Sequence, residues 1–139
     1  MQPVVGVILG SKSDLPLMES CVKVLEDLGL THELKVCSAH RNPRGVMEWA
    51  TSARSRGLKV VIAAAGGAAH LPGVVAAWTD LPVIGVPVPT QHLQGIAIAA
   101  VRGKELGKRK SRLTVGQPVD HLLLGFRETI DVRVRRIAT

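Results

Sequence analysis

Short segments with two kinds of hydrophobic pattern alternate along the first 90 residues of the chain. Residues 3–9 and 60–65 are continuous apolar runs, as in strands that are buried on both faces of a sheet. Residues 32–36 and 82–88 predict two further strands of similar length. Four strands are therefore expected in this part of the chain.

Helices are predicted between these strands. Beyond a turn at residues 10–14, apolar residues recur at helical spacing as far as Leu28, with charged residues on the opposite face, and Gly29 ends the helix. A second helix is expected from Asn42 to Gly57, because an Asn followed by a Pro is typical of a helix N-terminus.

A third, short helix is predicted after the turn at residues 66–72, running through Ala77. Strands that alternate with helices at this spacing predict right-handed βαβ units around a parallel sheet, which is an α/β fold. The chain has 139 residues, so residues 1–139 are expected to form a single domain. After Gly95 the periodicity becomes irregular, and residues 96–139 are expected to form an atypical C-terminal segment.

Composition excludes several classes of protein. Hydrophobic residues make up 46% of the chain and charged residues 21%, which is typical of a globular domain and not of a disordered one. No apolar run reaches the roughly 18 residues of a membrane span, and the start Met1-Gln2-Pro3 lacks the pattern of a secretory signal. The two cysteines, Cys21 and Cys37, have neither disulfide-framework nor zinc-site spacing. A cytoplasmic location without membrane contact is expected.

The formal net charge of +7 is unevenly distributed. Residues 1–95 contain 8 Lys/Arg and 7 Asp/Glu, a net charge of +1, whereas residues 96–139 contain 10 and 4, a net charge of +6. A basic chain suggests nucleic-acid binding. Trp49, Trp78 and Phe126 are the only aromatic residues, too few for stacking on bases, so nucleic acid is not the expected partner.

Two loops that follow predicted strands carry side chains suited to chemistry, at the sheet edge where α/β proteins bind ligands. Residues 10–14 lead into a helix N-terminus, which favours phosphate; the alternative is that Ser13 or Asp14 simply caps the helix. In the next loop, His40 suits proton transfer and Arg41 suits contact with phosphate or carboxylate. The alternative for this pair is solvated surface.

The loop Gly66-Gly67-Ala68-Ala69-His70 consists mainly of small residues, which permit close approach of the backbone to a ligand. The alternative is a tight connection in which His70 only caps or packs. Cys37, near His40, either forms a thiolate pair with it or is a buried residue that ends a strand. The five histidines have no metal-ligand spacing, and no serine lies in a GxSxG motif, so neither a metal site nor a hydrolase triad is predicted.

Four motifs together resemble one family in both order and spacing. The motifs are Gly10-Ser11-Lys12-Ser13-Asp14, Ser38-Ala39-His40-Arg41, Ala65-Gly66-Gly67-Ala68-Ala69-His70-Leu71-Pro72-Gly73 and Gly85-Val86-Pro87-Val88. They resemble the N5-carboxyaminoimidazole ribonucleotide mutase (PurE) family of bacterial purine biosynthesis, from about Val4 to Gly95. The loop at residues 66–70 resembles the mutase branch, not the carboxylase branch that uses carbon dioxide directly.

The resemblance implies a three-layer α/β/α, flavodoxin-like fold assembled into a homo-octamer. It implies an isomerase that moves a carboxylate of a ribonucleotide substrate from the exocyclic nitrogen to ring carbon 4, without a metal or any other cofactor. Ser11 and Arg41 are implied to bind the substrate phosphate and Asp14 the ribose. The implied catalytic residues are His40, as the general acid/base, and His70. The full set of implied substrate-binding residues is Ser11, Asp14, Ser38, Arg41, Gly66, Gly67, Ala68, Ala69 and Leu71, where residues 66–69 with His70 hold the carboxylate and the carbon dioxide.

The resemblance stops near Gly95. Ile96-Ala97-Ile98 stands where the family has Asp-Ser-Leu, and residues 104–112 replace a Gln-Met-Pro segment. In the family these parts complete the active site and contact neighbouring subunits. The alternative function is therefore a non-catalytic nucleotide- or nucleic-acid-binding protein that uses the basic cluster Lys108-Arg109-Lys110-Ser111-Arg112.

Overall fold

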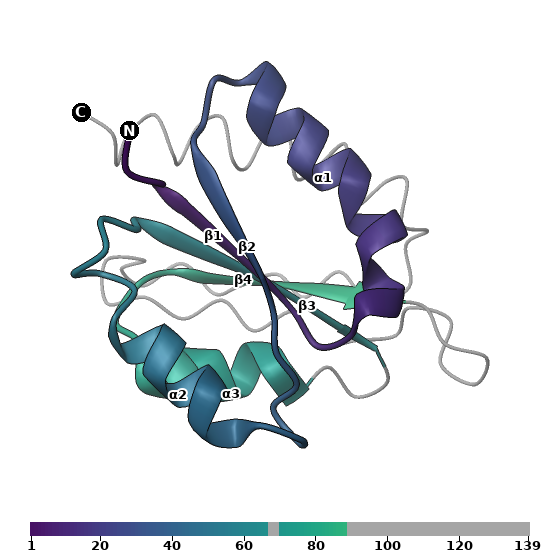
Figure 1. Cartoon of the computed structure of the whole chain (residues 1–139), viewed down its shortest axis with the longest axis vertical. Helices are drawn as coiled ribbons and strands as arrows, with labels where there is room; N and C mark the ends of the chain where they lie inside the picture. The colour runs from purple at the N-terminus through teal and green to yellow at the C-terminus, as the bar shows by residue number, and fades with distance from the viewer. Residues whose placement is uncertain (67–69, 89–139) are drawn as a thin grey trace, which may run out of the picture.

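A computed structural model of the chain describes residues 1–66 and 70–88, shown in colour in Figure 1. The regular elements follow one another as strand, helix and strand, in the order predicted from the sequence. Their bounds are β1 Val5–Leu9, the 3-10 turn η1 Lys12–Asp14, α1 Leu15–Asp27, β2 His32–Val36, α2 Pro43–Thr51, β3 Val60–Gly66, α3 His70–Trp78 and β4 Val83–Val88. The predicted elements beyond residue 95 lie outside the described residues.

The four strands form one parallel sheet in the order β2-β1-β3-β4. β1 lies between β2 and β3, and its last residue, Leu9, pairs with Val36 on one side and with Ala64 on the other. β1 and β2 therefore end at the same level, and β3 runs two residues further, to Gly66. The parallel α/β sheet predicted from the sequence is confirmed.

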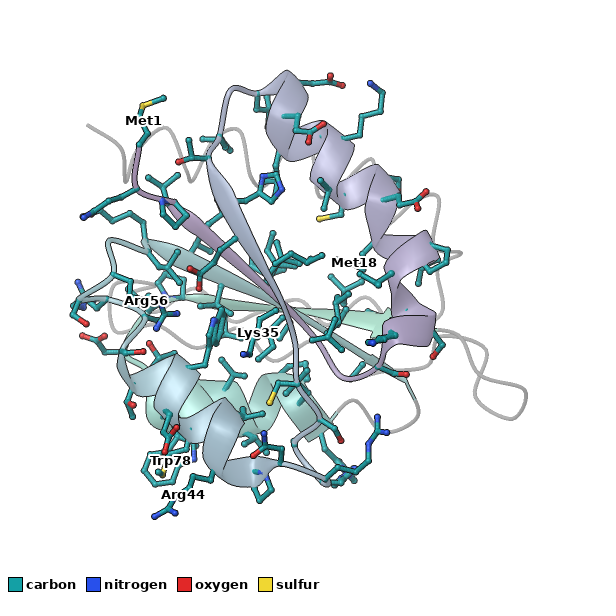
Figure 2. The ribbon with its side chains drawn as sticks, viewed as in Figure 1. Met1, Met18, Lys35, Arg44, Arg56 and Trp78 are labelled. Carbon is teal, nitrogen blue, oxygen red and sulfur yellow. The ribbon has the colours of Figure 1, made fainter. Side chains whose placement is uncertain are left out.

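Helices cover both faces of this sheet, α1 on one and α2 with α3 on the other (Figure 1). Met18 and Leu25 of α1 pack with Val7 of β1, and Figure 2 shows Met18 between the helix and the sheet. On the opposite face, Val46 of α2 and Val75 of α3 belong to a second buried cluster. The described part of the chain is thus the predicted three-layer α/β/α arrangement.

Gly6 lets α2 approach the sheet closely. A Cβ at Gly6 would lie 2.7 Å from Leu58 Cδ1 and 2.9 Å from Trp49 Cη2. Both atoms belong to the layer of α2 and the segment that follows it. The missing side chain in β1 is therefore part of how this layer packs.

Two helix boundaries differ from the prediction. α2 ends at Thr51 and not at Gly57; residues 52–57 form turns, and Gly57 adopts a φ of +97°. α3 begins at His70, before Pro72, whereas a start after Pro72 was expected. Pro72 is accommodated because a proline in the first helical turn lacks only an N–H that would have no partner within the helix.

Candidate active site

The predicted site loops meet at the carboxyl ends of β1, β2 and β3. A cavity of about 380 Å³ opens there, next to the point where the chain order of the strands reverses, which is where open α/β sheets bind ligands. Its described lining residues are Gly10, Ser11, Asp14, Ser38, Ala39, His40, Ala65, Gly66, His70 and Leu71. We call this space the histidine cavity.

His40 and His70 contact each other at this cavity. Nε2 of His40 lies 3.0 Å from Nδ1 of His70, and the rings meet edge to face at 88° with their centroids 5.2 Å apart. His40 comes from the loop after β2, and His70 is the first residue of α3, after β3. A hydrogen bond between two ring nitrogens requires one to carry a hydrogen and the other a lone pair. The pair can therefore hold and move a proton at a defined position.

Asp14 is the one buried charged residue in the described part of the chain, at 9% exposure. Burial raises the pKa of its carboxyl group, and a hydrogen bond with the Ser11 backbone partly opposes this rise. The Asp14 side chain makes no cap hydrogen bond to α1. The simple capping interpretation of Asp14 is therefore wrong, and a buried carboxylate at a cavity wall is typical of a functional group.

The helix-capping side chain in this loop is that of Ser11. Its Oγ accepts a hydrogen bond from the Ser13 backbone N–H at 3.3 Å and lies 2.9 Å from the Ser13 hydroxyl oxygen. This cap orders the short turn Lys12–Asp14 that leads into α1. The Ser11 hydroxyl oxygen thus holds the loop in shape at the cavity wall.

Beside the histidine cavity lies a second cavity of about 410 Å³, which we call the basic cavity. The described residues that line it are Gly10, Ser11, Lys12, Val36, Cys37, Ser38, Arg41 and Asn42. Gly10, Ser11 and Ser38 line both cavities, so the two spaces adjoin. Lys12 and Arg41 supply two cationic side chains to the basic cavity, which suits a phosphate.

The structure divides the predicted site residues between these two spaces. Gly66 and Leu71 line the histidine cavity with Asp14 and the histidines, whereas Arg41 lines only the basic cavity. Gly67, Ala68 and Ala69 lie outside the described residues. Sequence reasoning gave no role to Lys12 or Asn42 at a cavity, although each lies beside a predicted site residue.

The two cysteines are both buried and free. The Cys37 thiol donates a hydrogen bond to the backbone carbonyl of Asn42, at an Sγ–O distance of 3.7 Å. Cys37 is thus the buried strand-end residue of the two interpretations given above. Cys21 lies on the buried face of α1, and burial raises the pKa of its thiol to about 12.

Residues 1–66 and 70–88 contain neither a candidate metal site nor a candidate membrane span. No three His, Cys, Asp or Glu side chains in these ranges are grouped so that they could hold a metal ion. No helix within them is long and apolar enough to cross a membrane.

Comparison with known proteins identifies relatives over the part of the chain that carries these cavities. N5-carboxyaminoimidazole ribonucleotide mutase of Aquifex aeolicus (strain VF5) is 56% identical over 96 residues, which cover 69% of this chain and 58% of that protein. The mutase of Pyrococcus abyssi is 56% identical over 94 residues, covering 68% and 54%. The chain therefore spans little more than half the length of these relatives.

Solved structures support the fold. The crystal structure of Treponema denticola PurE2-S38D superposes with a TM-score of 0.68 at 19% identity, covering 99% of this chain and 86% of that one. Treponema denticola PurE gives a TM-score of 0.66 at 20% identity. The sequence profile of AIR carboxylase matches residues 4–100, slightly beyond the predicted limit near Gly95. Because this match covers more than half of its residues, the chain belongs to the AIR carboxylase family.

Proposed function

We propose that the chain acts as an N5-carboxyaminoimidazole ribonucleotide mutase, which transfers a carboxylate from the exocyclic nitrogen of the substrate to ring carbon 4. The observation that carries the proposal is the contact of His40 with His70, 3.0 Å between ring nitrogens, in a cavity beyond the strand ends. Support also comes from relatives with this name at 56% identity over the same residues.

The reaction needs one group that first gives and then takes a proton. In the proposed mechanism His40 protonates the exocyclic nitrogen as the carbon–nitrogen bond breaks and carbon dioxide leaves. Carbon 4 then attacks the carbon dioxide, and His40 removes the proton from that carbon. One proton is given and one is returned, so the reaction is balanced as an isomerisation. An imidazole is suited to both steps near neutral pH.

We propose that His70 has two tasks in this mechanism. Its Nδ1 orients the His40 ring through their mutual hydrogen bond, and its side chain and the backbone of residues 66–69 hold the carboxylate and the trapped carbon dioxide. The small residues of this loop suit a closed, water-poor pocket, in which carbon dioxide is retained between the two half-reactions. No metal, ATP or organic cofactor has a step in this chemistry.

The ribonucleotide is proposed to lie across both cavities. Its phosphate binds in the basic cavity, where Arg41 and Ser11 are predicted ligands and Lys12 adds a second cation. Asp14 binds the ribose hydroxyls from the wall of the histidine cavity, where Leu71 also lies, and Ser38 lines both cavities between phosphate and ring. This arrangement places the imidazole ring of the substrate beside His40.

Assembly belongs to the proposal as well. We propose a homo-octamer in the cytoplasm, as the resemblance to the family implies. The alternative function, nucleic-acid binding through residues 108–112, concerns a segment outside the described residues, and no observation on residues 1–66 and 70–88 favours it.

Turnover of carboxyaminoimidazole ribonucleotide tests the activity, with the rate in the absence of protein subtracted. His40→Asn is expected to lower kcat by about 10²-fold or more, because general acid–base catalysis typically contributes 10²–10⁴-fold. His32→Asn is the matched control, since His32 begins β2, at the end of the sheet opposite the cavities. A folded wild-type chain with no more turnover than His40→Asn would contradict the proposal. Measurement of the mass in solution tests the octamer.

A further inference from the structure

We propose that Asn42 is a positioning residue that fixes the turn carrying His40 and Arg41. Asn42 is not among the site residues predicted from the sequence. The inference rests on the proposed function, because it assigns to Asn42 the presentation of these two side chains to the substrate. Its structural basis is a set of hydrogen bonds between the end of β2, the turn and the start of α2.

The turn from Ser38 to Asn42 is held by its backbone. The N–H of Asn42 donates to the Ser38 carbonyl at 2.9 Å, and the N–H of Arg41 donates to the Ser38 hydroxyl at 3.2 Å. The side chains of His40 and Arg41 are exposed, so packing against a core does not hold them. The geometry of the turn therefore decides where both side chains lie.

Asn42 connects this turn to α2. Its Oδ1 accepts a hydrogen bond from the N–H of Gly45 at 2.9 Å, the helix cap that the sequence predicts. Its carbonyl accepts the N–H of Val46 at 3.3 Å and the thiol of Cys37 at 3.7 Å. One residue thus joins the helix, the turn and the last residue before Ser38.

Gly45 leaves the space that the Asn42 amide occupies. A Cβ at Gly45 would lie 2.5 Å from Asn42 Nδ2 and 2.9 Å from its Cγ. Glycine inside a helix costs about 1 kcal/mol relative to alanine. Gly45 weakens the helix, but any side chain at this position would displace the Asn42 amide that caps it. We assign Gly45 and Asn42 together to the shape of this turn.

Loss of the cap is expected to move both functional side chains of the turn. His40 lines the histidine cavity and Arg41 the basic cavity, so one displacement disturbs the reacting end and the phosphate end of the substrate. A misplacement of 1 Å in a catalytic group can cost on the order of 10²-fold in rate. Asn42→Ala is expected to lower kcat by about 10- to 100-fold and to raise KM.

The test compares four variants of the 139-residue chain. Asn42→Ala removes the cap, and Asn42→Ser keeps a capping oxygen of similar strength. Gly45→Ala displaces the cap while leaving Asn42 in place. Glu48→Gly is the control, because it weakens the same helix by about 1 kcal/mol and removes only the exposed ion pair with Arg44, outside the turn from Ser38 to Asn42.

Two readouts are needed, kcat with KM and the ring ¹⁵N signals of His40 and His70 at one fixed pH. Asn42→Ala and Gly45→Ala are expected to shift the ring signals of His70, although neither changes that residue. Asn42→Ser is expected to restore both readouts and Glu48→Gly to leave them as in wild type.

Unchanged ring signals in Asn42→Ala, or an equal loss of kcat in Glu48→Gly, would overturn the inference. A wild-type chain without turnover would count against the proposed function instead. In that case the ring signals still decide whether Asn42 positions His40 against His70.

Discussion

Nε2 of His40 and Nδ1 of His70 lie 3.0 Å apart, although 30 residues separate them in the sequence. Each of these nitrogens already has the other as its partner. A substrate atom that receives a proton from Nε2 of His40 must therefore take the place of His70 Nδ1. We therefore expect this hydrogen bond to orient the His40 ring until the substrate atom replaces His70 as the partner of Nε2.

This contact predicts that the two histidines act as a unit. His40→Asn and His70→Asn are each expected to lower kcat by about 10²-fold or more. The double variant is expected to be hardly slower than the worse single variant, because effects of residues in direct contact are not additive. Steady-state rates of the wild type, the two single variants and the double variant give the coupling free energy between His40 and His70. Losses that multiply in full would show that the residues act independently.

The buried carboxyl group of Asp14 is expected to lower the free energy of unfolding at neutral pH. Burial raises the pKa of its carboxyl group in the folded chain above the unfolded value of about 3.9. A raised pKa favours folding while the group is neutral, and this contribution is lost as the pH rises through the folded-state pKa. Asp14→Asn is therefore expected to be more stable than wild type at pH 7, with a gain that shrinks towards pH 3.

Urea unfolding at several pH values measures this gain. Glu19→Gln is the control, since Glu19 is an exposed residue of α1 and such substitutions stay within about 0.5 kcal/mol. Asp14→Asn should be more stable than this control at pH 7, and it should also raise KM for the ribonucleotide. A variant that is less stable than wild type at pH 7 would contradict the role of burial.

Gly6→Ala is expected to lower the free energy of unfolding by about 1–3 kcal/mol, the usual cost of overpacking. The new methyl group would lie 2.7 Å from Leu58 Cδ1. Leu58→Val removes that atom, so Gly6→Ala should cost less in the Leu58→Val background. Denaturant unfolding of the four proteins provides the cycle. Equal costs in both backgrounds would mean that the close contact is relieved in some other way.

Cys21 is expected to resist thiol reagents in the folded protein. Its thiol is buried between α1 and the sheet, and its pKa of about 12 keeps it protonated at pH 8, whereas the thiolate is the reactive form. In a Cys37→Ala background, alkylation at pH 8 should be slow until denaturant is added. Rapid labelling of the native protein, followed by mass spectrometry, would show that α1 opens readily.

Much of the scaffold follows from local pattern. The apolar runs at residues 3–9 and 60–65 and the Asn42-Pro43 helix start are confirmed because burial on both faces and helix capping depend on near neighbours. The prediction that α3 starts after Pro72 is wrong, because a proline also fits within the first turn of a helix.

The site was harder to predict because it depends on distances between loops. The sequence places His40 beside Arg41, yet the structure directs them to two different cavities. The burial of Asp14 and the contact between the histidines arise from the packing of three segments, which no spacing along the chain reports. The roles of these residues in binding and catalysis remain predictions for the experiments above.

The pairing of β1 with both β2 and β3 has a consequence for how the site forms. Leu9 pairs with Val36 and with Ala64, and strands in a sheet lie about 4.8 Å apart, so β2 and β3 are separated by about 10 Å with β1 between them. His40 follows β2 and His70 follows β3, so the hydrogen bond between their rings joins the segments on either side of β1. This hydrogen bond requires that β2 and β3 have both paired with β1 in the observed register. The histidine contact would therefore report whether the three strands are paired in register.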